Sequence, residues 1–256
     1  MSALAAKSLA SRELKSFFRQ RSRVMAAVLT PVVLWLMLGS GMGSSFRSEV
    51  FRGDFLEYFF PGIVVFSVVF AGMYSTISTI QDRQAGFLQS VLVAPIPRAS
   101  LVLGKVVGGA TIALIQGVVL LVLLPLAGVE LSPVGLVLAI GILALISVAM
   151  TGMGFVFAWR IDSVQGYHAI MNLILMPMWM LSGAFFPADG ASAWVRGVMA
   201  VNPLAYGLAA LRHALYWGDE TLRAGLPAMW LCVGITALCG LLAVWASARA
   251  VAKKPF

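Results

Sequence analysis

Long apolar stretches without any charge dominate this chain and recur along its length. Six of them cover about 24–42, 58–80, 106–128, 131–159, 163–187 and 226–248, and none contains Asp, Glu, Lys or Arg. About 20 helical residues cross a hydrocarbon layer of about 30 Å, so each stretch can span a membrane. A charge at mid-membrane costs about 2.5–3.5 kcal/mol, which explains why charges are excluded from them. The pattern predicts an all-α polytopic membrane protein, with six transmembrane helices in one domain, 1–256.

Composition and charge agree with this prediction and add an orientation. Of the 256 residues, 61% are hydrophobic and 11% charged, whereas soluble domains carry about 25% charged residues. Most Lys and Arg lie before the first stretch, between the second and third, at Arg160 and in the tail, whereas the other loops are rich in acids. Cytoplasmic loops retain positive charge, so both termini are predicted to be cytoplasmic. Cleavage of 1–45 as a signal peptide is disfavoured, because it would leave five spans and spoil this alternation.

The first basic segment, 3–23, has helical periodicity. Arg12, Lys15, Arg19 and Arg23 recur at steps of three or four, and apolar residues occupy another face. This spacing predicts an interfacial amphipathic helix. Two roles remain open for it, a membrane anchor and a contact for a cytoplasmic partner.

A second amphipathic segment, 81–98, lies between the second and third stretches. Phe87, Leu88 and Val91 form an apolar stripe at helical spacing, and Pro95 and Pro97 end the helix that they predict. A short helix is therefore expected across the cytoplasmic face, where a soluble partner could push on it.

Residues 190–218, between the fifth and sixth stretches, form two apolar pieces that are each too short to span a membrane. Asn202-Pro203 separates them. We expect a pair of re-entrant or interfacial helices at the outer leaflet. Two further spans are disfavoured, because they would bury Arg196 and Arg212.

Several segments together resemble the type-2 ATP-binding-cassette exporter permeases, with the daunorubicin-resistance and nodulation-factor export components as the most similar branch. The segments that carry the resemblance are FPGIVVFS at 60–67, DRQAG at 82–86, APIPR at 94–98, LGK at 103–105, LSGAFFP at 181–187, NPLAY at 202–206 and LR at 211–212. They cover nearly the whole chain and occur in the expected order.

The resemblance implies a partner and a site that contacts it. In this family the segment 82–98 corresponds to the coupling helix, which touches a cytoplasmic ATPase, and two permeases work with two ATPase domains. The residues assigned to coupling are Asp82, Arg83, Gly86, Phe87, Leu88, Val91, Pro95 and Arg98. The transported substrates implied are amphipathic, drug-like or lipid-linked molecules moving outward.

A translocation path is expected where two copies meet around the second and fifth stretches. Met and aromatic side chains adapt to varied apolar ligands. The candidates for the lining are Phe66, Phe70, Met73, Tyr74, Asn172, Met176, Trp179 and Met180. Ordinary helix packing or lipid contact is the alternative explanation for these residues.

The chain itself has no phosphate-binding signature G-x-x-x-x-G-K-[ST], since Val106 follows Gly104-Lys105. ATP and Mg²⁺ are therefore expected on a separate ATPase subunit, with no cofactor and no metal on this chain. Two other classes remain as alternatives. A secondary transporter or channel is disfavoured because no stretch contains an acidic or basic residue of the kind that couples ions. An intramembrane enzyme with His168 or His213 as base is disfavoured because no Gly-x-Ser-Gly sequence accompanies them.

Overall fold

In a computed structural model the protein is described over residues 3–42, 54–93, 97–129, 132–188, 190–223 and 225–253. Every regular element within these residues is helical, which confirms the predicted all-α class. In chain order they are α1 (Ala3–Arg19), α2 (Arg21–Met42), α3 (Phe55–Ser75), α4 (Ile77–Gln84), α5 (Phe87–Val93), α6 (Arg98–Leu121), the 3-10 turn η2 (Leu124–Ala127), α7 (Pro133–Arg160), α8 (Val164–Trp179), the π-helical turn η3 (Met180–Ala184), α9 (Ala193–Val201), α10 (Pro203–Leu215) and α11 (Met229–Lys253).

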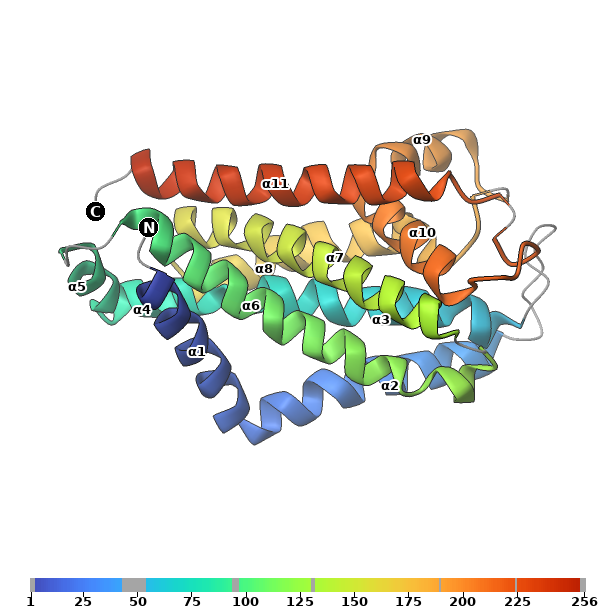
Figure 1. Ribbon diagram of the computed structural model, residues 1–256, viewed down its shortest axis with the longest axis horizontal. Helices are drawn as coiled ribbons and strands as arrows, with labels where there is room; N and C mark the ends of the chain where they lie inside the picture. The colour runs from blue at the N-terminus through green and yellow to red at the C-terminus, as the bar shows by residue number, and fades with distance from the viewer. Residues whose placement is uncertain are drawn as a thin grey trace.

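The long helices form an elongated bundle with two different ends (Figure 1). Helices α3, α6 and α7 pack against one another in its middle, α11 lies along α7, and α2 lies along α3. Helices α1, α4 and α5 gather at the end that also holds both termini, whereas α9 and α10 lie at the other end. The two candidate sites of the sequence analysis, 81–98 and 190–218, are therefore separated by the length of the bundle.

Five of these helices are long and apolar enough to cross a membrane: α2, α3 continued by α4, α6, α7 and α11. The chain is thus a multi-pass membrane protein by length and composition. The predicted stretch 163–187 is the exception, because α8 has only 16 residues and passes into the five-residue turn η3. Gly183 in this turn has φ 88°, and the Asn202 amide donates hydrogen bonds to the carbonyls of Met178 and Leu181 at 2.7 and 3.0 Å. These contacts end the regular helix earlier than hydropathy indicates.

Two further boundaries differ from the sequence prediction. The second stretch is divided at Thr76 into α3 and α4, and the third begins at Arg98 rather than at residue 106. Lys105 consequently lies inside α6 and is 3% exposed. The hydropathy pattern excluded Lys105 from the helix because it scores the charge of this residue alone. The carboxylates that neutralise the charge come from other helices.

The core and the periphery of the bundle are both apolar. Helix α3 is largely buried, with Phe59, Val64 and Val68 at 0% exposure. Helices α2 and α11 bury little of their surface and turn large apolar side chains outward, which in water would be unfavourable. The exposed residues are Met25, Leu29, Val33, Leu36 and Met37 on α2, and Trp230, Leu231, Leu238, Leu241, Leu242 and Trp245 on α11. These outward faces are therefore expected to contact lipid hydrocarbon or another apolar surface.

Helix α1, predicted over 3–23, ends at Arg19 and packs against α6. Gly104 and Gly108, one helical turn apart on α6, make this close approach possible. A Cβ atom on Gly104 would lie 2.7 Å from Leu9, and one on Gly108 would lie 3.0 Å from Glu13. Small residues at this spacing let two helix backbones approach closely. The amino-terminal helix is therefore part of the folded bundle.

Candidate functional site

A buried cluster of charges lies where α1, α4 and α6 meet. Lys105 Nζ donates a hydrogen bond to Glu13 Oε1 at 2.7 Å and another to the Asp82 carboxylate. Arg12 Nη1 donates to Asp82 Oδ2 at 3.0 Å, and this hydrogen bonding raises the pKa of Arg12. The side chains of Glu13, Asp82 and Lys105 are at most 8% exposed. Two positive and two negative charges thus neutralise one another, and the three that are buried, Glu13, Asp82 and Lys105, each have a partner of opposite sign, as buried charges require.

Arg83, the next residue, ties α4 to the carboxyl end of α7. Its guanidinium donates to the carbonyl of Trp159 at 3.0 Å and to that of Ile161, and it lies 3.4 Å from the carboxylate of Asp162. Carbonyls in the last turn of a helix have no intrahelical partner, and a cation there is favourable. Asp82 and Arg83 therefore fix α4 to helices on both sides of it.

Helix α5 follows directly and turns its apolar stripe inward. Gly86, with φ 74°, separates α4 from α5. Leu88 is 0% exposed, and Phe87 and Val91 are partly buried in a second core with residues of α1, α6 and α7. The Arg12 guanidinium lies 4.0 Å from the centroid of the Phe87 ring. The stripe therefore attaches α5 to the bundle.

The exposed residues at this end include Gln84, Ala85 and Ser90. Arg98 of the predicted coupling set donates to the carbonyls of Val251 and Ala252 near the end of α11, both at 3.3 Å. Pro95 lies outside the described residues.

The expected lining residues from α3 and α8 meet in one aromatic row. The rings of Phe66 and Phe70 are 4.3 Å apart, and Phe66 lies 4.6 Å from Trp179. The Tyr74 hydroxyl donates to Asn172 Oδ1 at 2.5 Å, at the exposed edge of the row. Trp179 is 1% exposed, and its Nε1 donates to a backbone carbonyl of α3 at 2.8 Å.

The three candidate methionines separate into two groups. Met73 is 0% exposed and packs against Gly154 of α7, which places it in the core. Met176 and Met180 are each 43% exposed on the outer side of α8 and η3, with Leu173 at 75% beside them. The outward apolar face at α8 therefore carries Met176 and Met180 but not Met73.

A cavity of about 310 Å³ opens on the opposite side of the aromatic row, between α2, α3 and α6. Phe66, Phe70 and Tyr74 line it from α3, with Arg23 at the start of α2 and Gln116 of α6. Gln116 is 6% exposed. The sequence analysis missed this residue because an isolated Gln in an apolar stretch is indistinguishable from a surface position. It likewise missed Glu13, whose partner Lys105 is distant in sequence.

No group of three or more His, Cys, Asp or Glu side chains within the described residues could hold a metal ion. The polar groups collected above are held by ion pairs, carbonyls and aromatic rings. These contacts hold α4 and α5 against α1, α6 and α7, and the aromatic row provides apolar surface.

An all-helical bundle with five helices of membrane-spanning length among the described residues is the architecture of a multi-pass membrane protein. The family model described as "ABC-2 type transporter" matches residues 5–216. The chain belongs to the ABC-2 type transporter family, and the predicted resemblance is confirmed.

Curated relatives support the permease branch of this family. The chain is 27% identical over 201 residues to "Putative transport permease ycf38" of Cyanophora paradoxa, covering 76% of this chain and 68% of the relative. It is 22% identical over 231 residues to nodulation protein J of Rhizobium leguminosarum bv. viciae, covering 88% and 85%. It is also 22% identical over 194 residues to "Probable multidrug ABC transporter permease YbhR" of Escherichia coli strain K12, covering 73% and 51%.

Proposed function

We propose that the protein is the permease subunit of an exporter driven by ATP, which a separate ATPase subunit hydrolyses. ATP and Mg²⁺ bind that partner. The substrate is an amphipathic, drug-like or lipid-linked molecule, the membrane is the inner membrane of a bacterium, and both termini are cytoplasmic. The observation that carries this proposal is the attachment of α4 and α5. Asp82 connects them to α1 and α6, and Arg83 connects them to α7.

This attachment supports a coupling role because a push on α5 is transmitted to the bundle through buried contacts. Leu88 fills the second core, so α5 cannot move independently of it. The exposed Ala85 and Ser90 are available to the ATPase. Gly86 introduces no side chain between the two short helices.

The coupling contact is tested at Ser90. Ser90→Glu places a charge on the exposed side of α5, and we expect the amount of ATP-hydrolysing partner that co-purifies with the tagged chain to fall severalfold. Ala193→Glu, an equally exposed change on α9 at the other end, serves as the control. Equal recovery of the partner with both variants would refute the coupling role of α5.

Six spans require that α8 with η3 crosses the membrane. Their 16 and 5 residues extend roughly 30 Å, which matches the hydrocarbon layer. We infer that they form the fifth of six spans, so that α5 and α9 face opposite sides. After removal of Cys232 and Cys239, a cysteine at position 193 should react with an impermeant maleimide in intact cells, and one at position 85 only after permeabilisation. Labelling of position 85 in intact cells would refute this orientation.

The second permease copy is proposed to pack at the α8 face, so that the path runs between the two aromatic rows. Leu173, Met176 and Met180 supply the exposed apolar surface for this contact. In the same cysteine-free background, Leu173→Cys should form an oxidant-induced dimer. Leu241→Cys on α11, 71% exposed, is the matched control and should stay monomeric. Equal cross-linking at both positions would contradict a dimer through α8.

A further inference from the structure

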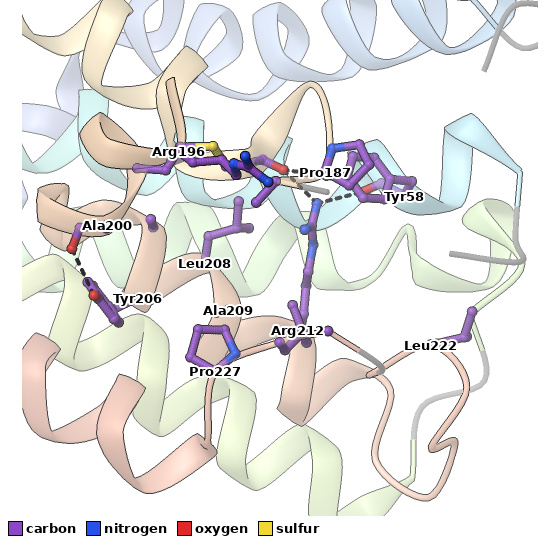
Figure 2. A pocket seen from close by; sticks show the side chains of 17 residues that line it. Tyr58, Pro187, Arg196, Ala200, Tyr206, Leu208, Ala209, Arg212, Leu222 and Pro227 are labelled. Carbon is purple, nitrogen blue, oxygen red and sulfur yellow. Dashed lines mark hydrogen bonds between the residues drawn. The ribbon is translucent and has the colours of Figure 1, made fainter. Parts of the chain in front are cut away.

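A cavity of about 300 Å³ lies at the end of the bundle formed by α9 and α10 (Figure 2). It is bounded by the start of α3, the turn η3, both of these helices, Leu222 and the residues 225–227. Its wall is mostly apolar, with Met199, Leu208 and Leu226 among the larger contributors. Ligand sites of small molecules begin at about this volume, so the cavity can accept a head group with part of an apolar tail.

A buried guanidinium, that of Arg212, forms part of this wall. Its side chain runs along the cavity from α10 toward Tyr58 and Pro187 (Figure 2). Nη2 donates to the carbonyls of Tyr58 and Gly183 at 3.2 and 2.9 Å, and the guanidinium carbon lies 4.1 Å from the Tyr58 ring centroid. These contacts hold the planar group in one orientation.

The charge of Arg212 nevertheless has no counter-charge among the residues that the structure describes. The residue is 6% exposed, its Nε–H is buried without an acceptor, and no carboxylate of the described residues pairs with it. A buried charge with neither water nor an anion beside it is costly. Arg212 differs in this from the charge cluster between α1, α4 and α6, where every buried charge has a partner of opposite sign.

A second guanidinium, Arg196 of α9, lines the same cavity (Figure 2). Its side chain is exposed and makes no ion pair with any described residue. The cavity therefore presents one held and one free guanidinium over an apolar wall. Guanidinium groups bind carboxylate and phosphate by charge-assisted hydrogen bonds, often in a bidentate manner.

We propose that this cavity binds the anionic head of an amphipathic molecule, a phosphate or carboxylate that bears an apolar tail. The head pairs with the guanidinium groups of Arg212 and Arg196, and the tail lies on Leu208 and Leu226. The molecule is either a bilayer lipid or an exported compound, which share this chemistry. The site exists in the permease alone and does not depend on the ATP-driven exporter proposed above.

The test uses the purified full-length chain in phosphatidylcholine nanodiscs, without ATPase, titrated with decyl phosphate. Decanol, which has the same tail and no charge, is the comparison ligand. We expect decyl phosphate to bind at least tenfold more tightly than decanol. Arg212→Gln should weaken decyl phosphate binding about tenfold and Arg196→Gln about threefold, as expected for lost charge-assisted hydrogen bonds.

Arg223→Gln is the matched control, since Arg223 belongs to the neighbouring loop but does not line the cavity. It should change binding less than twofold. If Arg212→Gln does not fold, the test relies on two substitutions at exposed positions, Arg196→Gln and the cavity-filling Ala200→Trp. Each should weaken the binding of decyl phosphate. Equal binding of decyl phosphate and decanol, or an effect of Arg223→Gln as large as that of Arg196→Gln, would overturn the proposal.

The source of the ligand is distinguished by repeating the titration in nanodiscs that contain phosphatidylglycerol. Competition by this anionic lipid, abolished in Arg196→Gln, supports the site and assigns it to the bilayer. Undiminished decyl phosphate binding supports the site and assigns it to a transported anion. Failure of co-purification with an ATPase would refute the exporter but leave these binding results unchanged.

Discussion

Replacing Lys105 by Met removes the one cation that contacts both carboxylates of the α1–α4–α6 cluster. Arg12 still pairs with Asp82, but Glu13 keeps a carboxylate that is 8% exposed and makes no other ion pair with the described residues. Breaking a buried ion pair by removing one member costs about 3–5 kcal/mol. For a protein of this size that corresponds to a melting temperature lower by about 6–20 °C.

The assay is thermal unfolding of the purified chain in detergent, followed by the loss of the monodisperse peak in size-exclusion chromatography. A double variant, Lys105→Met with Glu13→Gln, restores a neutral cluster and should recover at least half of the lost melting temperature. Arg12→Met is the milder comparison. Its side chain is 43% exposed, so its loss should cost about 1 kcal/mol. A melting temperature of Lys105→Met within 2 °C of wild type, or no recovery in the double variant, would refute the reasoning.

Three further changes test other contacts by the same assay. Arg83→Gln leaves the last carbonyls of α7 without their cation and should cost about 1.5–3 kcal/mol, and an unchanged melting temperature would show that α4 is not tied to α7. Trp179→Phe keeps an aromatic side chain but makes it smaller and removes the hydrogen bond to α3, so it should cost at least about 1–2 kcal/mol, whereas Met180→Leu at an exposed position should cost nothing measurable. Gly86→Ala forces a side chain into a left-handed conformation and should cost about 1 kcal/mol, whereas Gly234→Ala on the exposed side of α11 should be neutral or slightly stabilising.

Sequence patterns predicted the helical class and most of the apolar helices because hydrophobic length is a local property. They also predicted a short helix within 81–98, which the structure has at 87–93, and the break at Asn202-Pro203, since the apolar stripe and proline act within a few residues. The family resemblance followed from motifs that keep their order along the chain. These features need no knowledge of tertiary contacts.

Features that depend on distant partners could not be predicted in this way. Lys105 was placed in a loop because its charge was counted without Glu13 and Asp82, which lie 92 and 23 residues away. Arg212 was expected to avoid burial, yet it is buried and donates hydrogen bonds to the carbonyls of Tyr58 and Gly183. Hydropathy treats each residue alone, whereas burial of a charge is decided by the groups that fold against it.

Sequence also predicted candidate lining residues by type and helical position, and here the spacing alone was insufficient. Met73 follows Phe70 by about one turn and Phe66 by about two, but it packs against α7, while Tyr74 continues the aromatic row. Consecutive side chains on a helix point about 100° apart, so adjacent residues can belong to different surfaces. Here Met73 belongs to the core and Tyr74 to the aromatic row. The packing of α7 against α3, which no local pattern encodes, selects the side that is buried.

The docking of α1 on α6 has a consequence for biosynthesis. The ribosome produces Glu13 before Lys105, and it makes Gly104 and Gly108, the residues of α6 on which α1 packs, together with Lys105. The amino-terminal helix must therefore wait, with its carboxylate hydrated, until the third apolar helix of the chain has entered the bilayer. Assembly of this end of the protein thus begins only after α6 has been made, even though its first residues are the earliest to emerge.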